Sequence, residues 1–359
     1  MLTQAINSVI IGGLLSLLLY VPVVIFQYRR YGKFSFSRSI WLCIGLVYLT
    51  AVISYTLFPL PNITADFCAT HPRHFILDPT LYFRDMVRSF TGRPLSELLR
   101  SEEMMQMVLN VVLFVPLGVI VRQLWGFGAG RTVALGFAMS LTIELTQYTG
   151  NWFLEPCSYR VADINDLLAN TLGALFGAVL ALFLPRLAAD PAIMAAQRMN
   201  AQALTRSRRW MGQLLDLMFT GMVVNIVLMV QDIGIRLFTG SAARSEQTQL
   251  IIDSVAVGLT LCYLLAFSLI GNGASLGQRI VFLCPTPKGG ARWRLILRSM
   301  IVQGVGVSML LLPNIWWSPP VWVVLLAFAS VALTPHGISC LASGCTMVDV
   351  RANGAPAAC

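Results

Sequence analysis

Residues 160–177 read RVADINDLLANTLGALFG, a stretch that begins with charge and ends inside an apolar run. If this stretch is a helix, side chains three or four positions apart share one face. The polar and small residues then form a single stripe, which consists of Asp166, Asn170, Gly173 and Gly177.

Two properties of this stripe predict that it faces the inside of a membrane bundle. Gly173 and Gly177 form a small-xxx-small pair, which lets a neighbouring transmembrane backbone approach closely. Carboxylates within a membrane are expensive and usually face a partner or a cavity. The alternative is an ordinary helix start, in which Asp163 caps the N-terminus, Asp166 interacts with the dipole and Asn170 makes a packing hydrogen bond.

The composition indicates a membrane protein with an all-α fold. The chain has 359 residues, of which 57% are hydrophobic and 11% are charged, whereas roughly 25% charged residues are usual in soluble domains. Several apolar stretches of about 20 residues predict a polytopic transmembrane helical bundle. The net charge of +9 then reflects basic cytoplasmic loops near anionic lipid, and no nucleic-acid partner is expected.

We expect about nine spans, with the N-terminus outside and the C-terminus in the cytoplasm. This orientation places seventeen of the 25 Lys and Arg residues in cytoplasmic segments, as the positive-inside rule favours. The segment 62–106 then lies outside. The expected spans are residues 5–26, 40–60, 107–121, 132–148, 162–184, 210–230, 250–270, 295–312 and 321–333.

The chain is expected to divide at a basic, Ala-rich linker. Residues 1–185 would form a five-span domain rich in intramembrane polar residues, and residues 186–208 a cytoplasmic linker. Residues 209–359 would form a second transmembrane domain with another pattern.

A second polar cluster lies in the fourth expected span, where Ser140, Glu144 and Gln147 share one helix face. Under the proposed topology it lies in the outer half of the membrane, together with the polar residues that open the third and fifth spans. The sequence therefore predicts a ligand site open to the outer face. The alternative is that these groups only hold the bundle together, with Arg160 paired to Glu144 or Asp163. The candidate ligand-binding residues are Asn110, Glu144, Gln147, Arg160, Asp163, Asn165, Asp166 and Asn170.

We predict one disulfide bond, between Cys68 and Cys157. Both residues lie in segments that the topology places outside, where thiols can be oxidised, and no other Cys falls in an outer loop. The pairing follows by elimination, and two unpaired thiols are the alternative. The bond would clip the long outer segment to the loop that carries Arg160.

No pattern in the chain points to a metal or a cofactor. The oxygen-rich run Asp163-Ile164-Asn165-Asp166 lacks the Gly and the distal Glu of an EF-hand. His71 and His74 have no Cys or acidic partners at a zinc-site spacing. P-loop, GxSxG and GxGxxG elements are also absent from the sequence.

Four segments resemble the VanZ-like family, and the resemblance extends over about residues 40–184. They are YLTAVISYTLFPLP (48–61), LNVVLFVPLG (109–118), SLTIELTQ (140–147) and residues 160–177. The resemblance implies a multi-pass protein of the bacterial cytoplasmic membrane, linked through the family's name-giving member to low-level teicoplanin resistance. No settled biochemical activity comes with it. Asn165 stands where the family more often has a carboxylate, which puts a two-metal or carboxylate-pair mechanism in doubt.

A divergent resemblance to the RDD family covers about residues 205–350. It rests on RWMGQLLD (209–216), in which Arg209 precedes Asp216 by seven residues, and on GASLGQRIVFL (273–283). The segment HGISCLASGCT (336–346) has Cys340 where an acid is expected. Such domains have been suggested to take part in transport.

These observations favour a protein that binds a polar ligand or lipid headgroup at the outer leaflet and alters glycopeptide susceptibility or cell-envelope homeostasis. Its expected partners are membrane lipids and a lipid-linked envelope precursor or glycopeptide. One alternative is an enzyme acting on a lipid-linked substrate, with Glu144 or Asp163 as acid/base and Arg160 holding an anionic group. Another is a transporter whose second half couples to an ion through Asp216.

Overall fold

The structure, a computed structural model, is mostly helical and forms two compact units. Unit 1 contains Met1–Val23 and Ser35–Ile193, and unit 2 contains Val24–Phe34 and Met194–Cys359. The division between Ile193 and Met194 falls inside the expected linker. The residues described are 2–58, 62–70, 73–80, 84, 101–158, 160–239, 273–301, 329–331 and 337–352, with 247, 251, 254–255, 258–259, 262–263 and 266.

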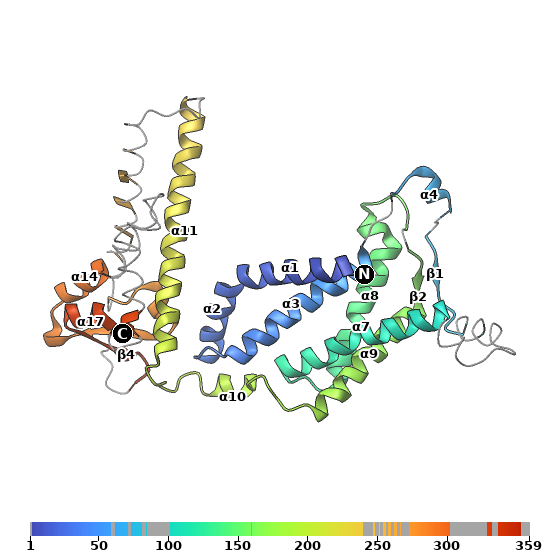
Figure 1. The fold of residues 1–359 in the computed structure, drawn as a ribbon, viewed down its shortest axis with the longest axis horizontal. Helices are drawn as coiled ribbons and strands as arrows, with labels where there is room; N and C mark the ends of the chain where they lie inside the picture. The colour runs from blue at the N-terminus through green and yellow to red at the C-terminus, as the bar shows by residue number, and fades with distance from the viewer. Residues whose placement is uncertain are drawn as a thin grey trace. The chain divides into compact units, whose positions relative to one another are not determined.

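Unit 1 is built around three long helices that follow one another in the chain, α7, α8 and α9 (Figure 1). Ser101 accepts the Met104 N–H group and so caps the start of α7, and Gly126 ends this helix in the left-handed conformation. The elements of unit 1 are α1 (Leu2–Leu18), α3 (Phe36–Leu57), α4 (Ala65–Thr70), β1 (Phe75–Ile76), α7 (Glu102–Trp125), α8 (Ala129–Phe153), β2 (Ala162–Asp163) and α9 (Ile164–Phe183). Two helices cross the division between the units, α2 (Tyr20–Tyr31) and α10 (Pro191–Ala196).

Helices α7 and α9 approach one another at backbone distance, as the glycine pair predicts. A Cβ atom at Gly173 would collide with the carbonyl oxygen of Val111, and one at Gly177 with that of Val115. On the opposite helix, a Cβ atom at Gly118 would collide with the carbonyl oxygen of Ala174. Glycine is therefore required on both sides of this contact.

Helix α3 and helix α8 complete the apolar core around this pair. The fully buried Phe114 of α7 is central to the core, and the phenolic O–H of Tyr48 in α3 donates to the carbonyl of Leu113, 3.0 Å away. The core places α3, α8 and α9 around α7, so that their polar residues meet near the start of α7. Its buried members are Val52, Phe114, Leu117, Val121, Ile143 and Ala174.

The described part of unit 2 packs one long helix against short elements. A two-stranded antiparallel sheet pairs Leu283 with Asp349 and Pro287 with Cys345. This sheet, together with the parallel pair of β1 and β2 in unit 1, departs from the expected all-α fold. The elements are α11 (Arg206–Thr239), α13 (Leu276–Ile280), β3 (Leu283–Pro287), η1 (Lys288–Gly290), α14 (Trp293–Ser299), α17 (Gly337–Ser343) and β4 (Cys345–Asp349).

A buried ion network fastens three distant segments of unit 2. The carboxylate of Asp349 lies 2.7 Å from Arg208 and 2.8 Å from Arg351, and all three side chains are buried. Arg351 also donates to the carbonyl oxygens of Gly32, at 3.0 Å, and Arg198, at 2.6 Å. Both arginines pair with the same carboxylate. Asp349 therefore supplies the negative charge that neutralises the two buried guanidinium groups.

The described residues support fewer spans than the nine expected. Four helices are long and apolar enough to cross a membrane, or five if α1 and α2, bent by 53°, count as one span. Helix α8, expected as the fourth span, is outside this set and carries the polar face of Ser140, Glu144 and Gln147. The expected spans 250–270, 295–312 and 321–333 lie wholly or largely outside the described residues, and the orientation of the chain stays a prediction. The four helical segments are Phe36–Leu57, Met104–Trp125, Ile164–Phe183 and Arg206–Gly234.

Gly177→Ala tests the α7–α9 contact. We expect the variant to lose stability, by about 1–3 kcal/mol, because the added methyl group meets the backbone of α7. Thermal unfolding in detergent, followed by circular dichroism, measures the effect. Gly130→Ala in α8 is the matched control, since nothing lies within 4 Å of a Cβ atom there. Equal melting temperatures for the two variants would contradict the close contact.

Asp349→Asn tests the ion network of unit 2. Burial by itself raises the pKa of Asp349, but hydrogen bonds from Arg351 and Arg208 outweigh it and hold the pKa below its ordinary value. The network therefore stabilises the folded state above about pH 4, the pKa of an unfolded Asp, and loses this contribution as the pH falls further. At pH 7 the variant should be destabilised by about 3–5 kcal/mol.

The pH dependence supplies the control for this variant. The difference in melting temperature between wild type and Asp349→Asn should shrink as the pH is lowered from 5 to 3. Asp190→Asn removes an exposed ion pair with Arg186 and should cost about 1 kcal/mol or less. A difference for Asp349→Asn that stays constant with pH would contradict the assigned charge.

Candidate functional site

Glu144 of α8 is a buried carboxylate that receives a backbone hydrogen bond. Its Oε2 atom accepts a hydrogen bond from the N–H group of Asp163, 3.0 Å away, and Glu144 is only 2% exposed. Asp163 immediately precedes α9, so this bond joins the middle of α8 to the start of α9. The chain thereby brings together the two polar stripes that the sequence analysis singled out.

Asp163 is the N-cap of α9, as its position before the apolar run predicts. Its Oδ1 atom accepts the Asn165 N–H group at 2.8 Å and the Asn165 side-chain amide at 2.9 Å. Asn165 therefore orients the cap. A carboxylate at position 165 would repel Asp163, whereas the Asn165 amide donates a hydrogen bond to Asp163.

Asp166 lies one turn further along α9 and faces α7. Its Oδ1 atom accepts the Asn110 amide at 2.6 Å, and the Gln106 amide lies 3.3 and 3.4 Å from its two oxygen atoms. Asp166 is half-buried, whereas Gln106 is exposed. This side of the cluster therefore reaches the surface of unit 1, as Arg160 also does.

Asn170 carries an unsatisfied acceptor inside the interface of α8 and α9. Its Nδ2 atom donates to Ser140 Oγ at 2.9 Å, and the residue is 3% exposed. Its Oδ1 atom is buried and has no hydrogen-bond partner among the described residues. Since buried polar atoms are rarely left unpaired, this oxygen points to a group that donates to it.

Gln147 and Arg160 both bond to the end of α3. The carbonyl oxygen of Thr56 accepts the Gln147 amide at 2.7 Å and the Arg160 guanidinium at 3.3 Å. The hydroxyl of Ser158 donates to the carbonyl oxygens of Gln147 and Arg160. These bonds set the position of the loop between α8 and α9 against α3.

The cluster contains more negative than positive charge. Glu144, Asp163 and Asp166 are close enough to repel one another, and Arg160 is close enough to attract Glu144 and Asp166. Arg160 nevertheless forms no ion pair with Glu144 or Asp163 within 4 Å; its guanidinium bonds to the Thr56 carbonyl. The pairing by which Arg160 would hold the bundle together is therefore not the arrangement found.

The last residues of α8 form a left-handed turn that leads into the loop between α8 and α9. Gly150, Asn151, Trp152 and Phe153 all have positive φ angles, between 55° and 67°. The Trp152 N–H group donates to Thr149 Oγ1 at 2.9 Å, which helps to hold this strained turn.

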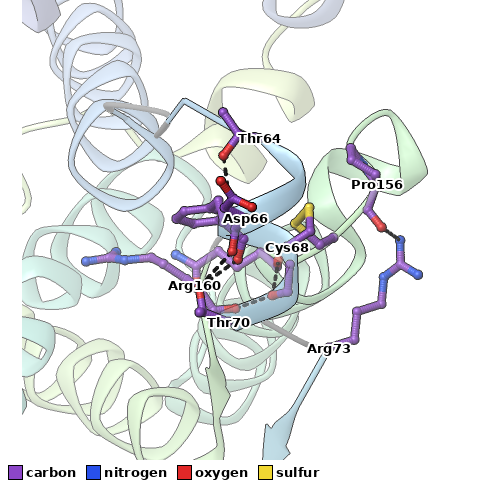
Figure 2. The surroundings of a disulfide bond; sticks show 11 residues. Thr64, Asp66, Cys68, Thr70, Arg73, Pro156 and Arg160 are labelled. Atoms are coloured by element: carbon purple, nitrogen blue, oxygen red, sulfur yellow. Dashed lines mark hydrogen bonds between the residues drawn. A yellow bond between two sulfur atoms is a disulfide. The ribbon is translucent and has the colours of Figure 1, made fainter.

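A disulfide bond joins this loop to the segment 62–106, as predicted from the sequence. Cys68 of α4 and Cys157 are bonded, with their Cα atoms 5.4 Å apart (Figure 2). Beside the bond, Arg73 donates to the carbonyl of Pro156 at 3.3 Å, and its guanidinium lies 5.3 Å from the centre of the Phe153 ring. The described part of the segment 62–106 is thus bonded to the loop that leads to Asp163.

The short strand β1 continues this attachment. It pairs in parallel with β2, with Phe75 opposite Ala162 and Ile76 opposite Asp163. The Phe75 ring also meets the Tyr148 ring edge-on, with centroids 6.2 Å apart. Asp163 is therefore held from two sides, by Glu144 of α8 and by the backbone of β1.

The described residues contain no group of three or more His, Cys, Asp or Glu side chains arranged to hold a metal ion. The three acids of the cluster instead receive hydrogen bonds from amide groups.

In unit 2, Asp216 of α11 is buried and well bonded. Its Oδ2 atom accepts the Ser275 hydroxyl at 2.5 Å, and its Oδ1 atom accepts the Gly277 N–H group at 2.8 Å. Arg209 is buried beside Cys340. The motif residues Arg209 and Asp216 thus have different partners, and Ser275 and Gly277 come from the segment 273–283 that the sequence analysis associated with them.

Some residues that contact the polar cluster or form the ion network were not predicted from the sequence. Gln106 precedes Asn110 by one helical turn, so its spacing could have identified it. The Thr56 carbonyl and the ion network of Asp349 carry no such signal, because a backbone acceptor has no residue signature and Arg208 and Asp349 lie 141 positions apart.

Cys68→Ser combined with Cys157→Ser tests the contribution of the disulfide bond to stability. The chain-entropy model predicts a loss of roughly 4 kcal/mol at most, because the bond closes a loop of 89 positions whose ends the helices already restrain. Thermal unfolding compares the double variant with wild type, and Cys43→Ser, which replaces a free thiol, is the control. In a non-reducing digest of wild type alkylated before lysis, the two peptides should be found linked. Recovery of both cysteines alkylated would rule the bond out.

Comparison with known proteins finds a family match for the region that contains the polar cluster. No curated protein and no solved structure matches the chain. No match covers the segment of about 205–350 that resembles the RDD family, so Arg209 and Asp216 rest on sequence resemblance alone. Residues 45–185, which include every member of the polar cluster, match the model of the VanZ/LLP1 family.

Proposed function

We propose that the polar cluster of α7, α8 and α9 binds a polar ligand or lipid headgroup at the outer leaflet of a bacterial cytoplasmic membrane. This binding alters susceptibility to glycopeptides such as teicoplanin, or cell-envelope homeostasis. The region that matches the VanZ/LLP1 family supports the link to glycopeptides.

This proposal rests on the Glu144 carboxylate, which is buried and has few hydrogen-bond partners. A buried carboxylate is costly unless it is paired, yet Glu144 receives a single backbone N–H bond and no ion pair among the described residues. A purely structural role would be served by a smaller or neutral side chain. A charge kept at this position is better explained by a bound group that completes its contacts.

The disulfide-bonded loop supports the same function. Cys68–Cys157, the β1–β2 pair and the Thr56 carbonyl together fix the segment that presents Arg160 and Asp163. Prior fixation of binding groups reduces the entropy that is lost when a ligand binds. The loop therefore supports a preformed site rather than a connection of no further role.

Glu144→Gln tests the proposal. The amide oxygen still accepts the Asp163 N–H group, so stability should change by about 1 kcal/mol or less. If Glu144 binds ligand, the protection against teicoplanin that the protein gives to a susceptible host should be largely lost. The measurements are the minimal inhibitory concentration in cells with matched expression and the melting temperature of the purified protein.

Glu102→Gln is the control, because Glu102 is an exposed acid at the start of α7. It should leave both quantities unchanged. Parallel loss of folded yield and protection in Glu144→Gln would instead assign Glu144 a purely structural role.

A further inference from the structure

Four side-chain amides of the polar cluster donate to oxygen atoms within the cluster. Asn165 donates to Asp163, Asn110 and Gln106 donate to Asp166, and Asn170 donates to Ser140. The Asp163 N–H group is used by Glu144. The bonds concerned are those of 2.6–3.4 Å described above.

One buried oxygen atom of the cluster remains without a donor. Asn170 Oδ1 receives no hydrogen bond from any described residue. Asn170 is only 3% exposed, so bulk water does not satisfy this oxygen. A ligand group that completes its contacts must therefore donate a hydrogen bond to it.

The charge of the cluster also favours a ligand that donates hydrogen bonds, and in particular a cation. Glu144, Asp163 and Asp166 interact electrostatically with one another, and Arg160 is the cation that acts on Glu144 and Asp166. Three carboxylates against one guanidinium leave an excess of negative charge. An anionic group would be repelled here, whereas a cation would be attracted.

The size of the cluster excludes a bare metal ion as its best occupant. Asn170 of α9 lies seven positions after the N-cap Asp163, which corresponds to about 10 Å along the helix axis. This is wider than a coordination sphere, and the described acids form no metal-holding group. An organic cation with several N–H or O–H groups fits this spacing.

We infer that the cluster recognises a primary ammonium group, held by Glu144, Asp163 and Asp166, on a ligand whose further donors reach Asn170. This inference rests on the proposed function and specifies the ligand's chemistry. The group enters on the side of Asp166, where Gln106 is exposed and makes the longest contacts of the cluster. An ammonium of this kind occurs on amine-bearing lipid headgroups and on free amines.

Lipid retention by the full-length protein tests the inference. The protein is reconstituted in nanodiscs with equal amounts of phosphatidylethanolamine, phosphatidylglycerol and phosphatidylcholine, then purified in detergent, and its bound lipids are quantified by mass spectrometry. We expect phosphatidylethanolamine to be enriched several-fold over its share of the mixture. The enrichment should disappear in Glu144→Gln combined with Asp166→Asn, and persist in Glu102→Gln.

Arg160→Gln determines the sign of the recognised charge. Removing this exposed cation should increase retention of an ammonium headgroup and decrease retention of an anionic one. In phosphatidylcholine nanodiscs, titration with ethanolamine, against sodium chloride at equal ionic strength, identifies the source. A rise in melting temperature indicates a free amine, and retention of phosphatidylethanolamine without such a rise indicates a lipid.

The outcomes separate this inference from the proposed function. Enrichment of phosphatidylglycerol that Arg160→Gln weakens would overturn the ammonium assignment and leave headgroup binding in place. If wild type and the double variant retain the same lipids and neither responds to ethanolamine, both the inference and the proposed headgroup binding are wrong.

Discussion

The close approach of α7 and α9 is the constraint on which unit 1 depends. Gly118, Gly173 and Gly177 bring two helix backbones together at a distance that any side chain would prevent. Because the helices are so close, the short side chains of Asn110 and Asp166 can meet directly across the interface. The same glycines that allow tight packing thus allow the polar cluster to exist.

The end of α8 adds the second constraint. Glu144 reaches the backbone of Asp163 only because the loop between them returns through a left-handed turn at Gly150. A Cβ atom at Gly150 would collide with the carbonyl oxygen of Cys157, so the disulfide-bonded part of the loop packs directly on this turn. Packing, turn and disulfide therefore all specify the position of one buried carboxylate.

Local patterns predicted much of unit 1, and long-range contacts explain the rest. The stripe of Asp166, Asn170, Gly173 and Gly177 identified a buried helix face, because periodicity reports burial directly. The bond between Glu144 and the Asp163 backbone could not be predicted, since a backbone donor leaves no trace in the sequence. Strand β4 alternates between buried and half-buried residues, but its five residues are too short to outweigh an apolar context.

The bond from Arg351 to the Gly32 carbonyl has a consequence for how the chain assembles. The two residues are 319 positions apart, and both belong to unit 2. During synthesis, Arg351 is added 319 positions after its partner Gly32. Unit 2 therefore cannot complete its ion network while the ribosome is still translating the intervening residues. The early segment must therefore remain without this bond until the residues between Gly32 and Arg351 have been synthesised.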